Sequence, residues 1–455
     1  MGFARGVVMQ GVNRLWERLS GYFLNTSWMV FERFFTLGLN FLISIVLARH
    51  LGVSDFGIFS YAVSLVALFS VAGHVGLSGI LVKEFVSKSS DRLVVLQAGF
   101  LLKSSGYLLG VILLICFSYM TGEGVESVVL VILACGLLFQ ALEIVDFYFQ
   151  SEVRAKLPSI ARMVAISIAS LVKLFGVFLG MGIIYFAASN VLYLMLLGLG
   201  FSYVFVRYAN VGNVFAVDWG VVLLKAKSLL GDGALVFLGS IFALIYMKID
   251  QVMLKWMVGS EAVGVYSVAA VLSEAWYFIP VAVVSSLFPR LVNLRESGDE
   301  IGYYKNIQVL MDFLFWLAFL VALLIGGMSD FIIVSFYGPE YADAGGVLAV
   351  HIWASVFVFM RALLSRWIII EKVLVFSVVT QGMGALFNIV LNWFLIPEYQ
   401  EIGAAYATLV SYAVAGYFSL LLSRKTRKMF WIMSRAVFGL YRMFVWVRTR
   451  QVSAK

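Results

Sequence analysis

Long uninterrupted apolar runs dominate this chain of 455 residues and leave it few possible folds. A membrane-spanning helix needs about 20 predominantly apolar residues, and about twelve such runs follow one another here. The expected spans are residues 27–48, 56–80, 93–120, 125–149, 160–180, 182–205, 229–257, 262–289, 307–328, 345–370, 373–396 and 402–423. Only 13% of the residues are charged, too few to cover a water-soluble protein of this size. We therefore expect an all-α integral membrane protein with about twelve transmembrane helices.

Two short stretches have nearly the same sequence. Leu51–Ala62 and Val258–Ala269 share their glycines, an aliphatic-aromatic-serine triplet and a closing alanine, at an offset of 207 residues. Similarity at a fixed offset indicates an internal repeat. A membrane protein whose halves repeat is most often a transporter with its site between the halves. The sequence therefore predicts a transporter built from two six-helix lobes.

Basic residues fall in alternate connections between the expected spans. Lys and Arg cluster in cytoplasmic loops, so their positions predict the orientation of the chain. The connections near residues 83–92, 154–162, 207–227, 290–305 and 366–372 are basic, whereas the intervening connections are acidic or rich in glycine. Only Arg49 and His50 break the alternation. Both termini are expected to be cytoplasmic, and the two lobes to be related by an axis along the membrane normal.

Four parts of the chain follow from this topology. They are an N-terminal six-helix lobe, a cytoplasmic interlobe linker, a C-terminal six-helix lobe and a basic amphipathic cytoplasmic tail, at residues 1–206, 207–228, 229–423 and 424–455. The formal net charge is +8, and the tail supplies most of the excess. Because these charges flank apolar helices, we expect them to face anionic membrane lipid and expect no binding of nucleic acid.

The first span contains charged and polar residues that do not belong in lipid. Glu32 and Arg33 stand within it, and Asn25, Thr36, Asn40 and Ser44 recur at steps of three or four residues. That spacing places a polar stripe on one helix face. A charge near the bilayer centre costs about 2.5–3.5 kcal/mol, so intramembrane charges normally face a cavity or a partner. The stripe favours a water-filled cavity, with Arg33 and Asn40 as candidate substrate ligands.

The seventh span contains Lys248, Asp250, Gln251 and Lys255. One interpretation is that Asp250 pairs with a cation on a neighbouring helix and only stabilises the fold. In the other interpretation, Lys248 binds an anion on the substrate and Asp250 has a structural or coupling role.

Further polar residues complete the candidate site. Lys103 and Arg361 lie in apolar spans as additional anion ligands, and Gln381, Asn388 and Asn392 form a second stripe suited to hydroxyl groups. Carboxylates recur at Glu143, Asp146 and Glu274. Like Glu32, each carboxylate either carries a coupling proton or neutralises a basic neighbour.

The sequence contains no recognisable enzyme motif. HExxH, Walker A, GxSxG and CxxC patterns are all missing from the chain. We accordingly expect no cofactor, no metal site and no catalytic residue.

An ordered set of short motifs resembles the Wzx-type polysaccharide repeat-unit flippases of the multidrug/oligosaccharidyl-lipid/polysaccharide exporter superfamily. The motifs are Ala48–Ala62, Gly76-Leu77 before Lys83-Glu84, Lys248–Leu254, Val263–Ser267, Ser273-Glu274, Pro289, Asn388–Asn392 with Leu395-Ile396-Pro397, and Gly403–Thr408. The resemblance covers roughly residues 20–425. One departure is Gln400, which follows Tyr399 where a glycine is expected.

The resemblance implies two lobes that form a V and open alternately to each side of the bacterial inner membrane. The implied cargo is an undecaprenyl-pyrophosphate-linked oligosaccharide, moved from the cytoplasmic to the periplasmic leaflet for the synthesis of O-antigen, capsule or exopolysaccharide. A proton or sodium counter-ion and other polysaccharide-assembly proteins are further partners that it leaves open. Arg33, Lys103 and Lys248 suit the pyrophosphate, and the Asn and Gln stripes suit the sugars.

Two other functions stay open at this point. A multidrug or cation antiporter of the same superfamily would present acidic cavity residues to cationic drugs. An integral-membrane glycan enzyme would carry a large external loop or a catalytic His at a membrane face.

Overall fold

A computed structural model describes residues 2–74, 76–87, 91–121, 124–209, 218–439 and 442, with side chains described from residue 25 onward except Thr26. The described residues form helices joined by short connections, and no strand occurs among them. The chain divides into two compact units. Unit 1 comprises Met1–Ile43 and Phe69–Phe237, and unit 2 comprises Ser44–Leu68 and Leu238–Lys455.

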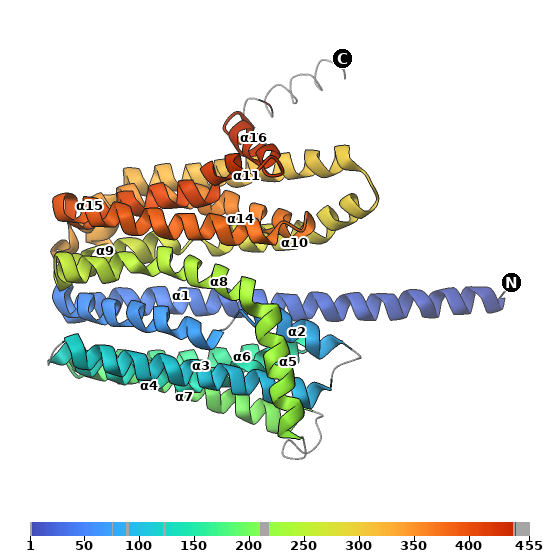
Figure 1. Cartoon of the computed structure of the whole chain (residues 1–455), viewed down its shortest axis with the longest axis horizontal. Coiled ribbons are helices and arrows are strands. Elements are labelled where there is room, and N and C mark those ends of the chain that lie inside the picture. The colour runs from blue at the N-terminus through green and yellow to red at the C-terminus, as the bar shows by residue number, and fades with distance from the viewer. Residues whose placement is uncertain are drawn as a thin grey trace. The chain divides into compact units, whose positions relative to one another are not determined.

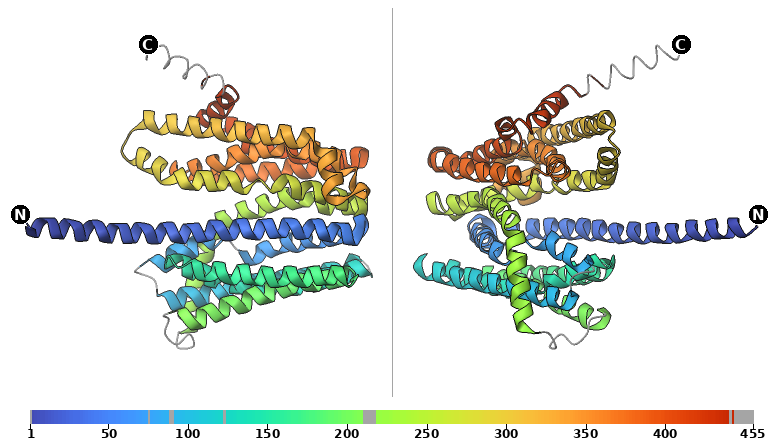
Figure 2. Two further views of the ribbon diagram at one scale, coloured as in Figure 1. Left: turned by 180° about the vertical axis from the view of Figure 1, so that it is seen from behind. Right: turned by 45° about the vertical axis from the view of Figure 1, so that its right-hand side comes forward.

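Unit 1 is a helical bundle in which most of the helices run side by side in Figures 1 and 2. After the start of α1 (Gly2–His74), it contains α2 (Ser78–Val86), α3 (Arg92–Thr121), α4 (Val125–Gln140), the 3-10 helix η1 (Ala141–Glu143), α5 (Ile144–Ser151), α6 (Lys156–Phe178), α7 (Ile183–Tyr208) and the first part of α8 (Trp219–Met257). Its core includes Leu81, Phe85, Val95, Tyr148 and Phe149, which are fully buried.

Unit 2 is a second bundle. After the end of α8 it contains α9 (Ser260–Glu274), α10 (Phe278–Glu296), α11 (Glu300–Gly327), α12 (Ser329–Tyr337), η2 (Pro339–Tyr341), α13 (Ala344–His351), α14 (Ala354–Ile370), α15 (Leu374–Gly416), η3 (Phe418–Leu422) and α16 (Arg427–Ala436). The residues from Ser44 to Leu68 of α1 also belong to this unit.

Breaks in two long helices reconcile the structure with the predicted spans. Ten segments of the described chain are long and apolar enough to cross a membrane. The two longest, Ser27–Val86 and Leu374–Leu422, are interrupted by non-helical backbone at Gly52 and Gln400. Each part is long enough to cross separately, and Figure 1 shows α1 turning back on itself. The predicted all-α membrane fold with about twelve spans is confirmed.

The boundaries expected at residues 206 and 229 stay a prediction. The compact units follow the two halves of the chain, except that Ser44–Leu68 groups with unit 2. Residues 210–217 of the expected linker lie outside the described residues. The cytoplasmic position of the termini likewise stays a prediction.

Part of the predicted amphipathic tail is packed onto unit 2. In α16, Met429, Ile432, Met433 and Ala436 are buried in a hydrophobic core that includes residues of α11 and α14. Exposed positions of α16 hold basic residues and one large aromatic residue: Arg427, Lys428, Trp431 and Arg435. Residues 440, 441 and 443–455 lie outside the described residues, so the rest of the tail stays a prediction.

The two copies of the repeated motif lie against each other within unit 2. A Cβ atom at Gly57 would overlap the carbonyl oxygen of Ser260, and a Cβ atom at Gly264 would overlap that of Val53. Because Gly57 corresponds to Gly264 and Val53 to Ser260 in the repeat, the contact is reciprocal, as across a local twofold axis. Only glycine lets two helix backbones approach this closely.

We predict that Gly57→Ala destabilises the protein by about 1–3 kcal/mol, because the added methyl group forces two backbones apart. Gly38→Ala is the matched control, since a Cβ atom there has no neighbour within 4 Å. Thermal unfolding in detergent measures both variants. Equal unfolding midpoints for the two would show that the close crossing contributes nothing to stability.

Gln400 adopts a backbone conformation that favours glycine, with φ 51° and ψ −129°. This is the position at which the sequence comparison expects glycine. A non-glycine residue in such a region costs of order 1–3 kcal/mol.

Replacing Gln400 with glycine removes this strain, so we predict that Gln400→Gly raises the free energy of unfolding by about 1 kcal/mol. The same thermal unfolding experiment measures the effect. A lowered unfolding midpoint would contradict the strained conformation.

Candidate functional site

Arg162 links two carboxylates inside unit 1. Its Nη1 lies 3.1 Å from Oε2 of Glu32 on α1, and its Nη2 lies 3.0 Å from Oδ2 of Asp146 on α5. Thr36 donates a hydrogen bond to Glu32, and Gln150 donates one to Asp146. The donor–acceptor distance is 3.1 Å in both. These contacts join α1, α5 and α6 through one guanidinium group, whose planar shape suits two carboxylates.

A second ion pair lies in the same unit. The side chain of Lys103 is only 1% exposed, and its Nζ lies 2.9 Å from Oε2 of Glu143. The ammonium group also lies over the rings of Tyr107 and Phe147. This burial argues against the predicted contact between Lys103 and a substrate anion, because its donors already have partners inside the unit.

Arg162 is the residue that sequence reasoning missed. It stands three residues into a predicted span, yet the alternation of loop charges assigned it to a cytoplasmic connection. The signal available was its position beside apolar residues on both sides. Glu143, Asp146 and Glu274 each have a basic side chain within 4.0 Å. Neutralising a basic neighbour is one of the two roles predicted for these carboxylates.

The polar stripe of the first span divides between two environments. Asn25, Glu32 and Thr36 bind groups within unit 1, whereas Arg33 and Asn40 are exposed. Arg33 has no hydrogen bond or ion pair with any described residue. The stripe therefore serves partly to stabilise the bundle, and two of its members remain open to a ligand.

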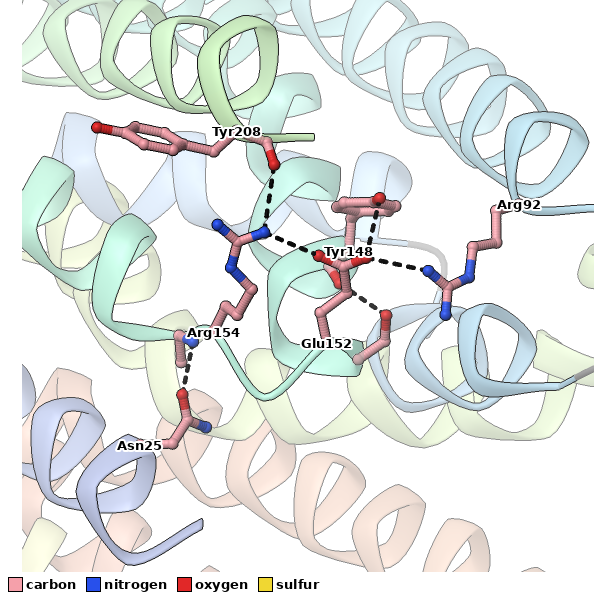
Figure 3. A network of polar contacts seen from close by, with 8 residues as sticks. Asn25, Arg92, Tyr148, Glu152, Arg154 and Tyr208 are labelled. Carbon is pink, nitrogen blue, oxygen red and sulfur yellow. Dashed lines mark hydrogen bonds and ion pairs between the residues drawn. The ribbon is translucent and has the colours of Figure 1, made fainter. Parts of the chain in front are cut away.

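A further network of polar contacts lies within unit 1 (Figure 3). Glu152 accepts hydrogen bonds from Arg92 at 3.0 Å, Tyr148 at 3.1 Å and Arg154 at 3.5 Å. Arg154 also donates to the carbonyl oxygen of Tyr208. Asn25 accepts from the backbone N–H of residue 155 at 2.6 Å. These contacts bring together parts of α1, α3, α5 and α7, and the segment that precedes α6.

Asp250 is the centre of a different network in unit 2. Its Oδ1 accepts from Asn392 at 2.5 Å, and its Oδ2 accepts from Tyr266 at 2.8 Å and Thr408 at 2.7 Å. Asn392 also donates to Asn388. Asp250, Asn388, Asn392 and Thr408 are at most 1% exposed. Uncharged hydroxyl and amide groups therefore compensate this buried carboxylate.

This network corrects two predictions. Of the two interpretations of Asp250, the pairing with a cation on a neighbouring helix is wrong, because no Lys, Arg or His of the described chain lies within 4.0 Å of Asp250. Asn388 and Asn392 bind Asp250 and each other, so the structure does not present them to sugar hydroxyls. Nδ2 of Asn388 and Oδ1 of Asn392 are buried without a partner among the described residues.

The remaining candidates of unit 2 are only partly buried. Nζ of Lys248 lies 3.9 Å from Oε2 of Glu274, a long ion pair with both side chains about a quarter exposed. Arg361 donates to the carbonyl oxygen of Ala415 at 2.8 Å. Gln381 bonds to Ser377 within its own helix. Of the predicted anion ligands in this unit, Lys248 and Arg361 can therefore still bind an anion.

Most of the charged candidate residues in the two units have ion-pair or hydrogen-bond partners, and few are available to a ligand. No group of three or more His, Cys, Asp or Glu side chains in the described residues has the arrangement of a metal site. Arg33 and Arg361 have no carboxylate partner among the described residues, and Asp250 has no cationic partner among them.

We predict that Arg162→Ala destabilises the protein by about 3–5 kcal/mol, because it leaves the buried Glu32 and Asp146 carboxylates without a cation. Arg154→Ala is the control, since Arg154 is 43% exposed and its ion pair is long. Yield of monodisperse protein and the thermal unfolding midpoint measure both. Equal losses in the two variants would show that the Arg162 bridge is no more important than a surface contact.

Comparison with known proteins gives one family match and several relatives. Residues 23–295 match the family described as "Polysaccharide biosynthesis protein". The "Probable flippase AglR" of Haloferax volcanii is 25% identical over 388 residues, which covers 81% of this chain and 76% of that protein. An uncharacterised membrane protein of Methanocaldococcus jannaschii is 21% identical over 448 residues, or 88% of this chain and 83% of that protein.

Solved structures of membrane transporters share this fold. The lipid II flippase MurJ in an inward closed conformation superposes with a TM-score of 0.69 at 17% identity, over 93% of this chain and 92% of that one. An inward-facing multidrug resistance transporter of the MATE family, in the MOP superfamily, gives a TM-score of 0.62 at 14% identity, over 90% of this chain and 96% of that one.

Proposed function

The chain belongs to the polysaccharide biosynthesis protein family, and from that premise we propose that it is a flippase for lipid-linked oligosaccharides. It moves undecaprenyl-pyrophosphate-linked repeat units from the cytoplasmic to the periplasmic leaflet of the bacterial inner membrane by alternating access. The glycan then enters the synthesis of a surface polysaccharide such as O-antigen, capsule or exopolysaccharide. Similarity to two proteins, a probable flippase and a lipid II flippase, supports this activity.

The observation that carries the proposal is an unpaired cation in an apolar span. Arg33 is exposed and has no carboxylate partner among the described residues, although Glu32 beside it is buried and paired. An arginine in this position is costly unless water or an anion meets it. A pyrophosphate supplies that anion, and guanidinium binds phosphate oxygens through two parallel hydrogen bonds.

The membrane potential favours export of such a headgroup. An inside-negative potential contributes roughly 2.3 kcal/mol per elementary charge per 100 mV, so a doubly charged pyrophosphate gains about 4–5 kcal/mol. The polyprenyl chain stays in the lipid, and only the polar headgroup needs a hydrated path. The protein does not need an enzymatic step for this movement.

Asp250 is the group proposed to bind a coupling cation. Its carboxylate is buried among the oxygen-bearing side chains of Asn388, Asn392, Thr408 and Tyr266, with no basic group within 4.0 Å in the described chain. The unsatisfied Oδ1 of Asn392 adds another oxygen. One negative charge and several neutral oxygens suit a proton or a sodium ion.

A multidrug or cation antiporter is the second candidate, favoured by the structural likeness to a MATE transporter. A cationic drug requires an available carboxylate. Glu32 and Asp146 are instead buried against Arg162, and Glu143 is bound to Lys103. These three carboxylates are therefore not available to a cationic drug and Asp250 is only 1% exposed, whereas Arg33 is exposed without a carboxylate partner among the described residues; this contrast supports the flippase.

We predict that Arg33→Ala lowers the rate of flipping by at least about tenfold, because the pyrophosphate loses a charge-assisted contact. The assay uses proteoliposomes containing a fluorescent lipid-linked oligosaccharide and a membrane-impermeant quencher. Arg92→Ala is the matched control, since Arg92 is 46% exposed and binds Glu152. Wild-type flipping by the Arg33 variant would remove the anion-binding argument, and a wild-type protein that does not flip the lipid would refute the function.

We predict that Asp250→Asn abolishes acceleration by a cation gradient and leaves acceleration by the membrane potential. The same proteoliposomes receive an imposed sodium gradient, proton gradient or potential in separate experiments. An unchanged response to sodium and proton gradients in the variant would exclude Asp250 as the coupling site.

A further inference from the structure

A small cavity in unit 2 is lined by aromatic side chains and one arginine. Its walls are formed by residues of α8, α14 and α15 and by Tyr277 in the turn before α10, and they include Tyr246, Phe357, Arg361 and Tyr412. The cavity volume is about 80 Å³, which is room for several water molecules or for one polar edge of a ligand. The cavity lies apart from the Asp250 network, because the two share no residue.

The charge of Arg361 is not compensated by any carboxylate. No Asp or Glu of the described chain lies within 4.0 Å of its guanidinium group, and its one hydrogen bond goes to the carbonyl oxygen of Ala415 at 2.8 Å. Arginine has five N–H donors, so most of them remain available. A partly buried and unpaired cation in a membrane span indicates an anionic ligand.

The aromatic walls restrict what that ligand is. Tyr246 and Tyr412 pack edge to face, with ring centroids 5.2 Å apart. The hydroxyl of Tyr277 is buried beside Ser273 and makes no hydrogen bond of normal geometry among the described residues. An isoprenoid chain supplies neither an anion nor a hydrogen-bond partner.

We propose that this cavity binds the carboxylate edge of an acidic sugar in the cargo's oligosaccharide, an inference that rests on the proposed flippase function. Arg361 binds the carboxylate, Tyr277 bonds to an adjacent hydroxyl, and the electron-rich faces of the other rings contact the C–H groups of the sugar. A pyrophosphate fits less well, because one arginine in an apolar pocket leaves at least one of its charges unpaired. The subsite thus selects glycans that contain a uronic acid.

Binding of simple glycosides to the purified full-length protein tests this subsite. The probes are methyl glucuronide, methyl glucoside and inorganic pyrophosphate, measured by titration calorimetry or saturation-transfer NMR. We expect the glucuronide to bind at least about tenfold more tightly than the glucoside, with Arg361→Gln removing the difference. Arg366→Gln is the matched control on the same helix, because Arg366 does not line the cavity.

Tyr277→Phe provides a second variant that does not depend on Arg361. Removing an unpaired hydroxyl leaves folding intact, so we expect an unchanged unfolding midpoint with weaker glucuronide binding. Equal binding of both glycosides by the wild type, tighter binding of pyrophosphate at Arg361, or glucuronide binding unaffected by both variants would each overturn the subsite. Flipping of a neutral lipid-linked glycan by Arg361→Gln at the wild-type rate, with loss for an acidic glycan only, supports it.

The two proposals fail in different ways. If the wild-type protein flips lipid-linked glycans but does not distinguish glucuronide from glucoside, the proposed function stands and the proposed subsite is refuted. A protein that binds glucuronide at Arg361 and flips no lipid-linked glycan loses the proposed function.

Discussion

Compensation of charge inside apolar helices is the constraint on which the rest of this structure depends. Unit 1 meets it with opposite charges, because Arg162 binds both Glu32 and Asp146 while Lys103 binds Glu143. Unit 2 meets it with neutral donors, which surround Asp250. The difference has a functional consequence: a carboxylate bound to arginine is already neutralised, whereas one held by hydroxyl and amide groups can still accept a small cation.

The cations that lack compensation are the positions proposed to bind the ligand. Arg33 is exposed without a carboxylate, Lys248 has only a long ion pair, and Arg361 has only a carbonyl oxygen. Of the other cations in the described spans, Lys103 and Arg162 have carboxylate partners, and Lys255 donates to the hydroxyl of Ser260. An anionic glycolipid headgroup matches this remainder in charge, and its hydroxyl groups match the exposed amide of Asn40.

The sequence predicted the spans because about 20 apolar residues per crossing is a strong and local signal. It also divided both long helices into two spans, at residues 49–55 and 397–401, where the structure has non-helical backbone at Gly52 and Gln400. That the two repeats contact one another through Gly57 and Gly264 was not predictable, since a fixed offset reveals equivalence and says nothing about proximity.

The site was predicted less well for a physical reason. Helical spacing shows which residues share a face, but it does not show what that face meets. Asn388 and Asn392 therefore looked suited to sugars, whereas they bind Asp250. Arg162 was overlooked because a basic residue near the end of a span resembles a loop charge. The stripe of the first helix divided for the same reason, with Glu32 turned to Arg162 and Arg33 left exposed.

The central claim is that Arg33 faces water and not acyl chains, and reaction of a cysteine at this position measures it most directly. Cys116 and Cys135 are first replaced by serine, and Arg33→Cys and the adjacent Phe34→Cys are then treated with a charged, membrane-impermeant thiol reagent in intact and permeabilised membranes. We predict rapid modification of the cysteine at position 33, and we expect a lipid-linked oligosaccharide to slow this reaction. A folded, membrane-inserted protein whose cysteine at position 33 stays unmodified from both sides would contradict it.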